Sequence, residues 1–333
     1  MILVTGGTGL VGAHLLYQLA LKHKKIRAIY RTLASINRTK AVFSFYSDKP
    51  ESLFNKIEWI EARIEDLPAL TLAFAEVDLV YHCAAIISFN PDDYKQMRKT
   101  NITGTANMIN LSLDFKIKKF CYVSSIATLE DAPKTGDVTE ENEWSGSENK
   151  CYAITKYGAE QEVWRGSQEG LEVVIVNPGV IIGPGFWESG SGQLFTNIYK
   201  GFQFYTLGVT GFVGVNDVAK AMIALMESNL SLERYILVSE NLNFKQVFDT
   251  IADALNVKKP TIKVTKWLSA LVWRLDTIKS FITNKPALFN KETAIASQQK
   301  TYYSAAKIKN ALCFEFEPMK DVFKKTALIF LKK

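Results

Sequence analysis

The sequence contains few of the side chains that usually bind transition metals. Its 333 residues include four cysteines and three histidines, and the cysteines stand far apart, at positions 83, 121, 151 and 313. Structural zinc sites use closely spaced Cys and His ligands, and no such spacing occurs here. We therefore expect no metal site. Cysteines scattered in this way also fit a reducing, cytoplasmic location.

Long apolar runs and strong local charge are scarce as well. The net charge of +6 is the small excess of 40 basic over 34 acidic residues. No basic stripe interleaved with aromatic residues indicates a nucleic-acid partner. Residues 1–21 carry no Lys, Arg, Asp or Glu, yet they include four glycines and lack the basic start of a signal peptide. We expect no integral membrane segment.

The most informative stretch is a glycine-rich turn directly after the apolar residues 2–4. It consists of Thr5, Gly6, Gly7, Thr8, Gly9, Leu10, Val11 and Gly12, and the apolar spacing that follows predicts a helix. Glycines let the backbone turn tightly and approach a pyrophosphate, while the helix N-terminus offers N–H groups and a positive dipole end. The turn therefore predicts a dinucleotide site, and a tight turn without a ligand is the alternative.

Strand-like and helix-like segments alternate through the first half of the chain. Strands are predicted over residues 26–30, 57–60, 78–85, 119–123 and 171–176, and helices over 67–74, 91–114 and 149–168, with a helix and loop over 35–54. Alternation without hairpin signals predicts an α/β fold with a Rossmann-type, doubly wound parallel sheet. Ligands bind beyond the carboxyl ends of such strands, where the glycine turn, Ala84, Ala85, Ser124 and Ser125 all fall.

The alternation ends after residue 177. We assign residues 1–177 and about 209–240 to an NADP-binding Rossmann domain, because a strand over 234–238 is expected to return to the main sheet. A smaller, mostly helical substrate domain is expected at about 178–208 and 241–333. This second domain contains an amphipathic helix over 244–255 and an apolar segment with Trp267, Trp273 and Phe281.

The sequence also lacks a carboxylate where NAD-binding folds hold the adenosine ribose. An acidic residue about 20 positions after the glycines usually binds the 2′-hydroxyl. Here Tyr30 and Arg31 occupy that place. A cation would accept a 2′-phosphate instead, so we favour NADP(H) over NAD(H). The alternative is that Arg31 simply faces solvent.

Tyr152 and Lys156 are candidates for proton transfer. A spacing of four places them on one face of the helix predicted over 149–168. Tyrosine is a poor base because its reference pKa is about 10, and a neighbouring ammonium favours the phenolate. A hydroxyl that orients the substrate oxygen could come from Ser125 or from Ser124 at the end of the preceding strand. A surface pair without function is the alternative for Tyr152 and Lys156.

The order and spacing of these segments resemble the extended short-chain dehydrogenase/reductase family, which is part of the NAD-dependent epimerase/dehydratase superfamily. The resemblance rests on the glycine turn, Tyr152 with Lys156, and residues 82–85, 101–107, 123–125, 177–185 and 212–219. It covers roughly residues 1–255. It implies a catalytic set of Ser125, Tyr152 and Lys156, with Asn101 shaping the active site.

The resemblance also implies the cofactor contacts. The pyrophosphate is expected on residues 6–12, and the other contacts are expected at Tyr30, Arg31, Arg63, Ile64, Cys83, Ala84, Ala85, Ser124, Tyr152, Lys156, Pro178, Gly179 and Val180. Arg63 is a departure, because many members carry an Asp there that contacts adenine. That contact is in doubt here or falls to backbone atoms at Ile64, and a second cation near the adenosine agrees with NADP(H).

Two absences separate the chain from sugar-nucleotide enzymes of this family. Residues 283–289 lack the Arg that usually binds the diphosphate, and Ser125 is followed by Ile126 and Ala127 rather than by an acidic pair. Residues 177–185 are more similar to dihydroflavonol-reductase-like and 3β-hydroxysteroid-dehydrogenase-like members, whose substrates are apolar. Candidate substrate contacts are the aromatic residues Phe89, Phe186, Trp187 and Phe195, with core packing as the alternative.

The sequence thus predicts an NADP(H)-dependent oxidoreductase. It is expected to transfer hydride between nicotinamide and a ketone or alcohol of a mainly apolar small molecule, with Tyr152 as proton donor or acceptor. One alternative is a sugar-nucleotide epimerase or dehydratase that uses the same Tyr in a transient oxidation. Another is a non-catalytic NADP(H)-binding regulator. The resemblance also implies a homodimer formed through the helices that contain Tyr152 and residues 91–114.

Overall fold

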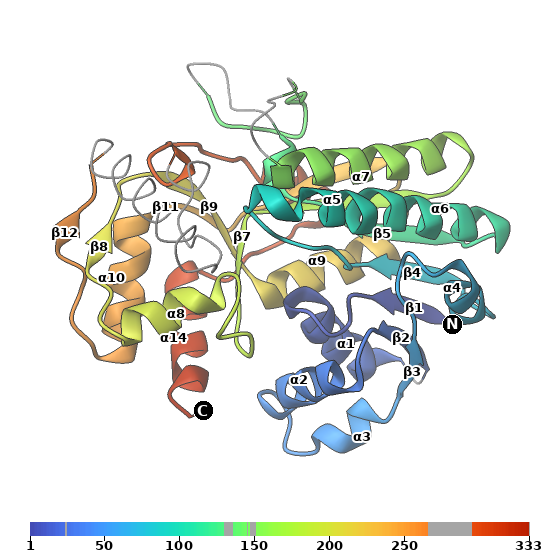
Figure 1. The fold of residues 1–333 in the computed structure, drawn as a ribbon, viewed down its shortest axis with the longest axis horizontal. Helices are drawn as coiled ribbons and strands as arrows, with labels where there is room; N and C mark the ends of the chain where they lie inside the picture. Colours follow the sequence, from blue (N-terminus) through green and yellow to red (C-terminus); the bar gives the residue numbers. More distant parts are fainter. Residues whose placement is uncertain (24, 130–135, 145, 147–150, 266–294, 333) are drawn as a thin grey trace.

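A parallel sheet of seven strands forms the centre of the molecule, in the order β10-β6-β5-β4-β1-β2-β3 (Figure 1). The computed structural model describes residues 1–23, 25–129, 136–144, 146, 151–265 and 295–332. The strands are β1 (Ile2–Thr5), β2 (Ile26–Tyr30), β3 (Ile57–Glu61), β4 (Leu79–His82), β5 (Lys119–Val123), β6 (Val173–Pro178) and β10 (Glu233–Leu237). Because the order runs outward in both directions from β1, the predicted doubly wound fold is confirmed.

Helices cover both faces of this sheet (Figure 1). One face packs against α1 (Leu10–Lys22), α2 (Leu33–Ser44), α3 (Pro50–Phe54) and α9 (Val215–Glu227). The other face packs against α4 (Leu67–Ala73), α6 (Gly104–Asp114) and α7 (Cys151–Gln168). Successive strand residues enter opposite layers, so Leu3 and Val4 are both fully buried, but in different cores. Strands buried on both faces are continuous apolar runs, which explains why the sequence indicates them well.

Several predicted elements have the expected bounds. β2 and α10 (Phe244–Leu255) match the prediction, and β10 pairs with β6, which confirms the return to the main sheet. The helix expected over 91–114 is instead composite. It starts as a 3-10 turn (Pro91–Asp93), continues as α5 (Tyr94–Met97) and a π-helical turn (Arg98–Thr103), and ends as α6.

Sequence analysis did not identify the small strands beside the main sheet. β7 (Val180–Ile182), β9 (Val209–Gly214) and β11 (Glu240–Asn243) form a three-stranded sheet, and β8 (Phe204–Tyr205) pairs with β12 (Ile262–Lys263). Apart from β9, they have only two to four residues, which is too short to show a clear periodicity. Residues 209–214 were expected in the Rossmann domain but lie in this second sheet. The proposed domain boundaries stay a prediction.

The helices α8 (Gly192–Tyr199), α10 and α14 (Met319–Phe330) enclose a separate core beside the second sheet (Figure 1). Phe195 is fully buried there against Trp187 and near Phe323. The short helix α13 (Ala306–Leu312) contacts β10 instead. The segment with Trp267, Trp273 and Phe281, and residues 283–289, lie outside the described residues. Within the described ranges, no helix is long and apolar enough to cross a membrane.

Replacing Phe195 with alanine is expected to lower the free energy of unfolding by about 3–5 kcal/mol, because it leaves a cavity in a closed core. Phe204→Ala is the matched control, since Phe204 is 43% exposed, and it should cost less than about 1 kcal/mol. Urea unfolding monitored by fluorescence and circular dichroism measures both. Equal losses for the two variants would contradict the assignment of Phe195 to the core.

Candidate active site

The glycine turn has a closed side and an open side. Gly6 has a φ of +67°, and a Cβ there would lie 2.6 Å from the backbone of Cys83. A Cβ on Gly12 would lie 2.2 Å from the carbonyl oxygen of Gly6, whereas one on Gly9 would meet only that oxygen, at 3.4 Å. Gly6 and Gly12 are therefore required for packing, and Gly9 leaves room for a ligand beside the backbone.

The start of α1 fits a pyrophosphate. Gly9 is the N-cap residue, and no side chain caps the helix. No acidic residue stands in the first turn, so the N–H groups and the positive dipole end are not neutralised by the helix itself. Thr8, Leu10 and Val11 are half-buried around this turn, and a Cβ on Gly7 would contact Leu16 at 2.8 Å.

The residues expected near the adenosine lie at the ends of β2 and β3. Tyr30 is half-buried with its ring edge-on to Trp59, and Arg31 directly after it is exposed. Arg63 is also exposed. The Ile64 side chain is buried, and its carbonyl accepts a hydrogen bond from Asn107 at 3.0 Å. The structure therefore places two cations at this end of the sheet, next to a fixed stretch of backbone.

Asn101 connects two parts of the site. It is 1% exposed and lies in the π-helical turn, a feature frequent at functional sites. Its Oδ1 accepts from the backbone N–H of Ile86 at 2.8 Å, and its Nδ2 donates to the Ile86 carbonyl and to the Thr155 hydroxyl, each at 3.0 Å. Asn101 thus holds the loop that follows β4, with Cys83, Ala84 and Ala85, against α7.

Tyr152 and Ser125 lie side by side at the carboxyl edge of the sheet. The Ser125 side chain is near enough to the Tyr152 phenol to affect its pKa. Burial raises the pKa of Tyr152 to about 12, and the Ser125 side chain opposes that rise. The Phe89 ring stands edge-on to the Tyr152 ring with 5.8 Å between centroids. An apolar surface thus borders the phenol.

Lys156 lies one helical turn beyond Tyr152 and is only 2% exposed. Its Nζ donates to the Tyr122 hydroxyl at 2.6 Å and to the Val123 carbonyl at 2.7 Å. Burial lowers the pKa of Lys156 to about 7, while Glu160 and Cys83 act in the opposite direction. The pKa of Lys156 therefore lies near neutral pH, where small changes in the surroundings of the side chain alter its charge.

The two candidate hydroxyls have different partners. Ser124 is buried and donates its hydroxyl proton to the carboxylate of Glu160 at 2.6 Å. Ser125 is half-buried, and its hydroxyl also accepts the backbone N–H of Ala127 at 3.1 Å. The geometry favours Ser125 as the hydroxyl beside the phenol.

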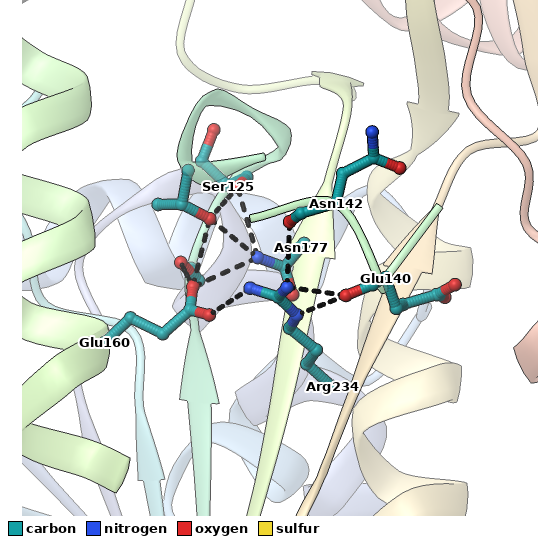
Figure 2. Close-up of polar contacts among 8 residues, drawn as sticks. Ser125, Glu140, Asn142, Glu160, Asn177 and Arg234 are labelled. Atoms are coloured by element: carbon teal, nitrogen blue, oxygen red, sulfur yellow. Dashed lines mark hydrogen bonds and ion pairs between the residues drawn. The ribbon is translucent and has the colours of Figure 1, made fainter. Parts of the chain in front are cut away.

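A buried carboxylate below the site was not recognised in the sequence. Glu160 is fully buried and accepts from Asn177 at 3.1 Å and from Arg234 at 3.1 Å, as Figure 2 shows. Asn177 also donates to the Ser125 carbonyl at 3.2 Å. Arg234 in turn donates to the carbonyls of Glu140 at 2.8 Å and Asn142 at 3.0 Å. This cluster fixes the backbone at Ser125. The sequence did hold a signal for it, because Glu160 lies one helical turn after Lys156 and thus on the same face of the predicted helix.

The candidate substrate residues do not share one place. Phe89 is 42% exposed beside Tyr152. Phe186 packs with Ala13 and Val42, and Trp187 and Phe195 belong to the core between α8 and α14. Those last two positions match the alternative of core packing. Substrate contact therefore stays a prediction that the structure favours only for Phe89.

The candidate cofactor residues after β6 are packed by the second sheet. Pro178 ends β6 and is buried, Gly179 donates to the Leu237 carbonyl at 3.0 Å, and Val180 begins β7. A Cβ on Gly179 would lie 2.4 Å from the carbonyl oxygen of Gly211, so packing alone requires this glycine. Their contact with a cofactor stays a prediction.

A doubly wound parallel sheet with an uncapped glycine turn at the carboxyl end of its first strand is the architecture of dinucleotide-binding α/β proteins. The chain belongs to the NAD dependent epimerase/dehydratase family, whose model matches residues 2–237. It is an NAD(P)-dependent enzyme of the extended short-chain dehydrogenase/reductase type.

Named relatives include both reductases and epimerases. The chain is 27% identical over 316 residues to a putative dihydroflavonol 4-reductase of Synechocystis, covering 91% of this chain and 87% of that protein. It is 25% identical over 287 residues to a UDP-glucose 4-epimerase of Vibrio cholerae, covering 82% and 81%. The crystal structure of gox2253 has a TM-score of 0.82 and 25% identity, and the match covers 100% of this chain and 98% of that one.

Gly9→Ala is expected to weaken cofactor binding about tenfold or more, which corresponds to ~1.4 kcal/mol, while leaving the fold intact. The added methyl fits the protein but enters the space beside the backbone where the pyrophosphate is expected. Gly12→Ala is the contrasting variant, because its Cβ overlaps the turn and should lower thermal stability. Nicotinamide fluorescence titration and thermal melting measure the two effects. Unchanged affinity in Gly9→Ala would contradict this placement of the pyrophosphate.

Proposed function

We propose that the protein is an NADP(H)-dependent oxidoreductase that acts on a ketone or alcohol of a mainly apolar small molecule. The observation that carries the proposal is the Tyr152 phenol, which lies beside Ser125, one turn from a buried lysine, and is bordered by Phe89. The similarity to a putative dihydroflavonol 4-reductase over most of both chains supports this branch.

The chain supplies the proton chemistry of this reaction. A bound nicotinamide gives or takes the hydride. Tyr152 donates a proton to the carbonyl oxygen during reduction and removes one from the alcohol during oxidation. Ser125 orients that oxygen by hydrogen bonding, and the Lys156 ammonium stabilises the phenolate through its positive charge. Asn101 keeps the loop after β4 and α7 at a fixed separation.

The preference for NADP(H) is supported by a difference in exposure between Arg27, within β2, and Arg31, directly after β2. Arg27 is buried and bound to Glu58 at 3.0 Å and to the Ala73 carbonyl at 3.0 Å. Arg31 is exposed and forms no ion pair with any residue that the structure describes. A guanidinium at the end of the second strand suits a 2′-phosphate.

Sugar-nucleotide epimerisation or dehydration is the second candidate, favoured by the likeness to a UDP-glucose 4-epimerase. Cofactor stoichiometry separates the two, because an epimerase consumes no net NADPH. A regulator that binds NADP(H) without turnover is the third candidate, and any turnover that depends on Tyr152 excludes it. We further propose a cytoplasmic homodimer that pairs through α6 and α7.

Tyr152→Phe is expected to lower kcat by about a hundredfold or more with an apolar ketone and NADPH, because it removes only the proton-transferring hydroxyl. Tyr157→Phe on the same helix is the control, since the Tyr157 ring stacks on Trp144 away from Ser125. NADPH oxidation measured by absorbance, with apolar ketones, aldehydes, UDP-sugars and dTDP-sugars, gives both values. Full turnover in Tyr152→Phe would contradict the proposal.

Arg31→Ser is expected to weaken NADPH binding about tenfold or more and to leave NADH affinity within about twofold, because only NADPH carries the 2′-phosphate. Arg98→Ser is the control, an exposed arginine beside Tyr94 on another helix. Equilibrium fluorescence titration of each cofactor provides the dissociation constants. A parallel loss for NADPH and NADH, or tighter binding of NADH by the wild type, would refute the assignment.

A further inference from the structure

A buried ammonium needs acceptors, and most of those available to Lys156 are in β5. An ammonium has three N–H donors. Protein atoms of the described residues take two of them, the Tyr122 hydroxyl and the Val123 carbonyl. The Nζ also lies 4.3 Å from the centroid of the Tyr122 ring, which is within cation–π range. One N–H is left for a ligand, so these two contacts determine where it points.

The hydroxyl of Tyr122 stands beside a chain of buried polar groups. Its neighbour Thr105 has a single hydroxyl proton and donates it to the Asn101 carbonyl at 2.6 Å. Because an ammonium can only donate, a lone pair of the Tyr122 oxygen accepts from Lys156, so the Tyr122 proton points away from Lys156.

The same chain continues to the glycine turn through His82. The His82 Nε2 lies 3.0 Å from the Thr105 oxygen, and its Nδ1 lies 2.6 Å from that of Thr5. Since Thr105 already donates to Asn101, His82 carries its proton on Nε2 and accepts from Thr5. Thr5 in turn accepts the Ala84 N–H at 3.2 Å. Every donor has an acceptor, which fixes the direction of the whole chain.

We propose that Tyr122 is a positioning residue whose hydroxyl holds the Lys156 ammonium in place, with one N–H directed at the bound cofactor. Thr105, which is held by Asn101 and His82, lies beside that hydroxyl. The importance of Lys156 for turnover rests on the proposed function, whereas its attachment to Tyr122 does not. Phenylalanine at position 122 would keep the ring and the packing but remove the acceptor.

The groups that face Lys156 come from three elements. Tyr152 and Glu160 lie on α7, His82 and Cys83 lie on and after β4, and Tyr122 lies on β5. Glu160 and Cys83 favour the charged form of the lysine. Burial, with the Lys156 charge nearby, lowers the pKa of His82 to about 3, so His82 stays neutral. Loss of the Tyr122 acceptor disfavours the ammonium, so the pKa of Lys156 should fall.

Tyr122→Phe is expected to move the titration midpoint of Lys156 to lower pH by about one unit, because a hydrogen bond to a charged group is lost. The measurement is NMR of cofactor-free protein labelled with ¹³C at lysine Cε, with the Lys156 signal assigned by its absence in Lys156→Arg. Tyr81→Phe is the control, since Tyr81 is equally buried but packs on the other face of the sheet.

Kinetics and cofactor affinity give the second readout. In Tyr122→Phe the basic limb of the pH profile of kcat should move to lower pH, and NADPH affinity should fall, with KM for the carbonyl substrate little changed. An unchanged Lys156 midpoint in folded Tyr122→Phe would overturn the proposal. If that variant does not fold, Thr105→Val should shift the midpoint in the same direction and Thr105→Ser should not. A wild type without turnover would refute the proposed function alone, since the NMR midpoint needs no substrate.

Discussion

The buried charge of Lys156 is the constraint on which the rest of the site depends. Moving an ammonium out of water costs several kcal/mol unless its N–H groups find acceptors in fixed positions. The sheet supplies them through the Tyr122 hydroxyl and the Val123 carbonyl of β5. Because a strand in the middle of a parallel sheet scarcely moves, the ammonium is fixed as firmly as the strand. Tyr152, on the same helix, is then fixed relative to it.

The same helix also contains a buried carboxylate, Glu160, which needs hydrogen-bond donors where Lys156 needs acceptors. Glu160 lies one turn beyond Lys156 and is bound by Ser124, Thr128, Asn177 and Arg234. Removing one partner of such a cluster would leave a buried charge unpaired, so the cluster resists change. Its partners come from the segment after β5, from β6 and from β10, so the carboxylate ties α7 to the edge of the sheet at three places. The Ser125 backbone is held by the same amide that binds Glu160.

Features that are local in sequence could be predicted, whereas pairings between distant residues could not. The glycine turn, the alternating elements and the Tyr152–Lys156 spacing each fit within one segment, and the structure contains all three. Arg234 and Glu160 are 74 residues apart, and the sequence around each residue does not indicate that the two form a pair. Tyr122 likewise looks like one more apolar residue of a buried strand until α7 places an ammonium beside its hydroxyl. Small strands such as β7 failed for another reason, because three residues show no periodicity.

The same physics separates the proton-transfer groups from the parts that select ligands. Lys156, Asn101 and Glu160 are almost wholly buried, and each is hydrogen-bonded to other elements of the fold, so the fold determines their geometry. Arg31 and Phe89 are exposed at the ends of strands or in loops, where a substitution changes few other contacts. Under the proposed function, cofactor and substrate preference can vary at these positions without disturbing proton transfer. Such a separation is consistent with relatives of this chain being named both as reductases and as epimerases.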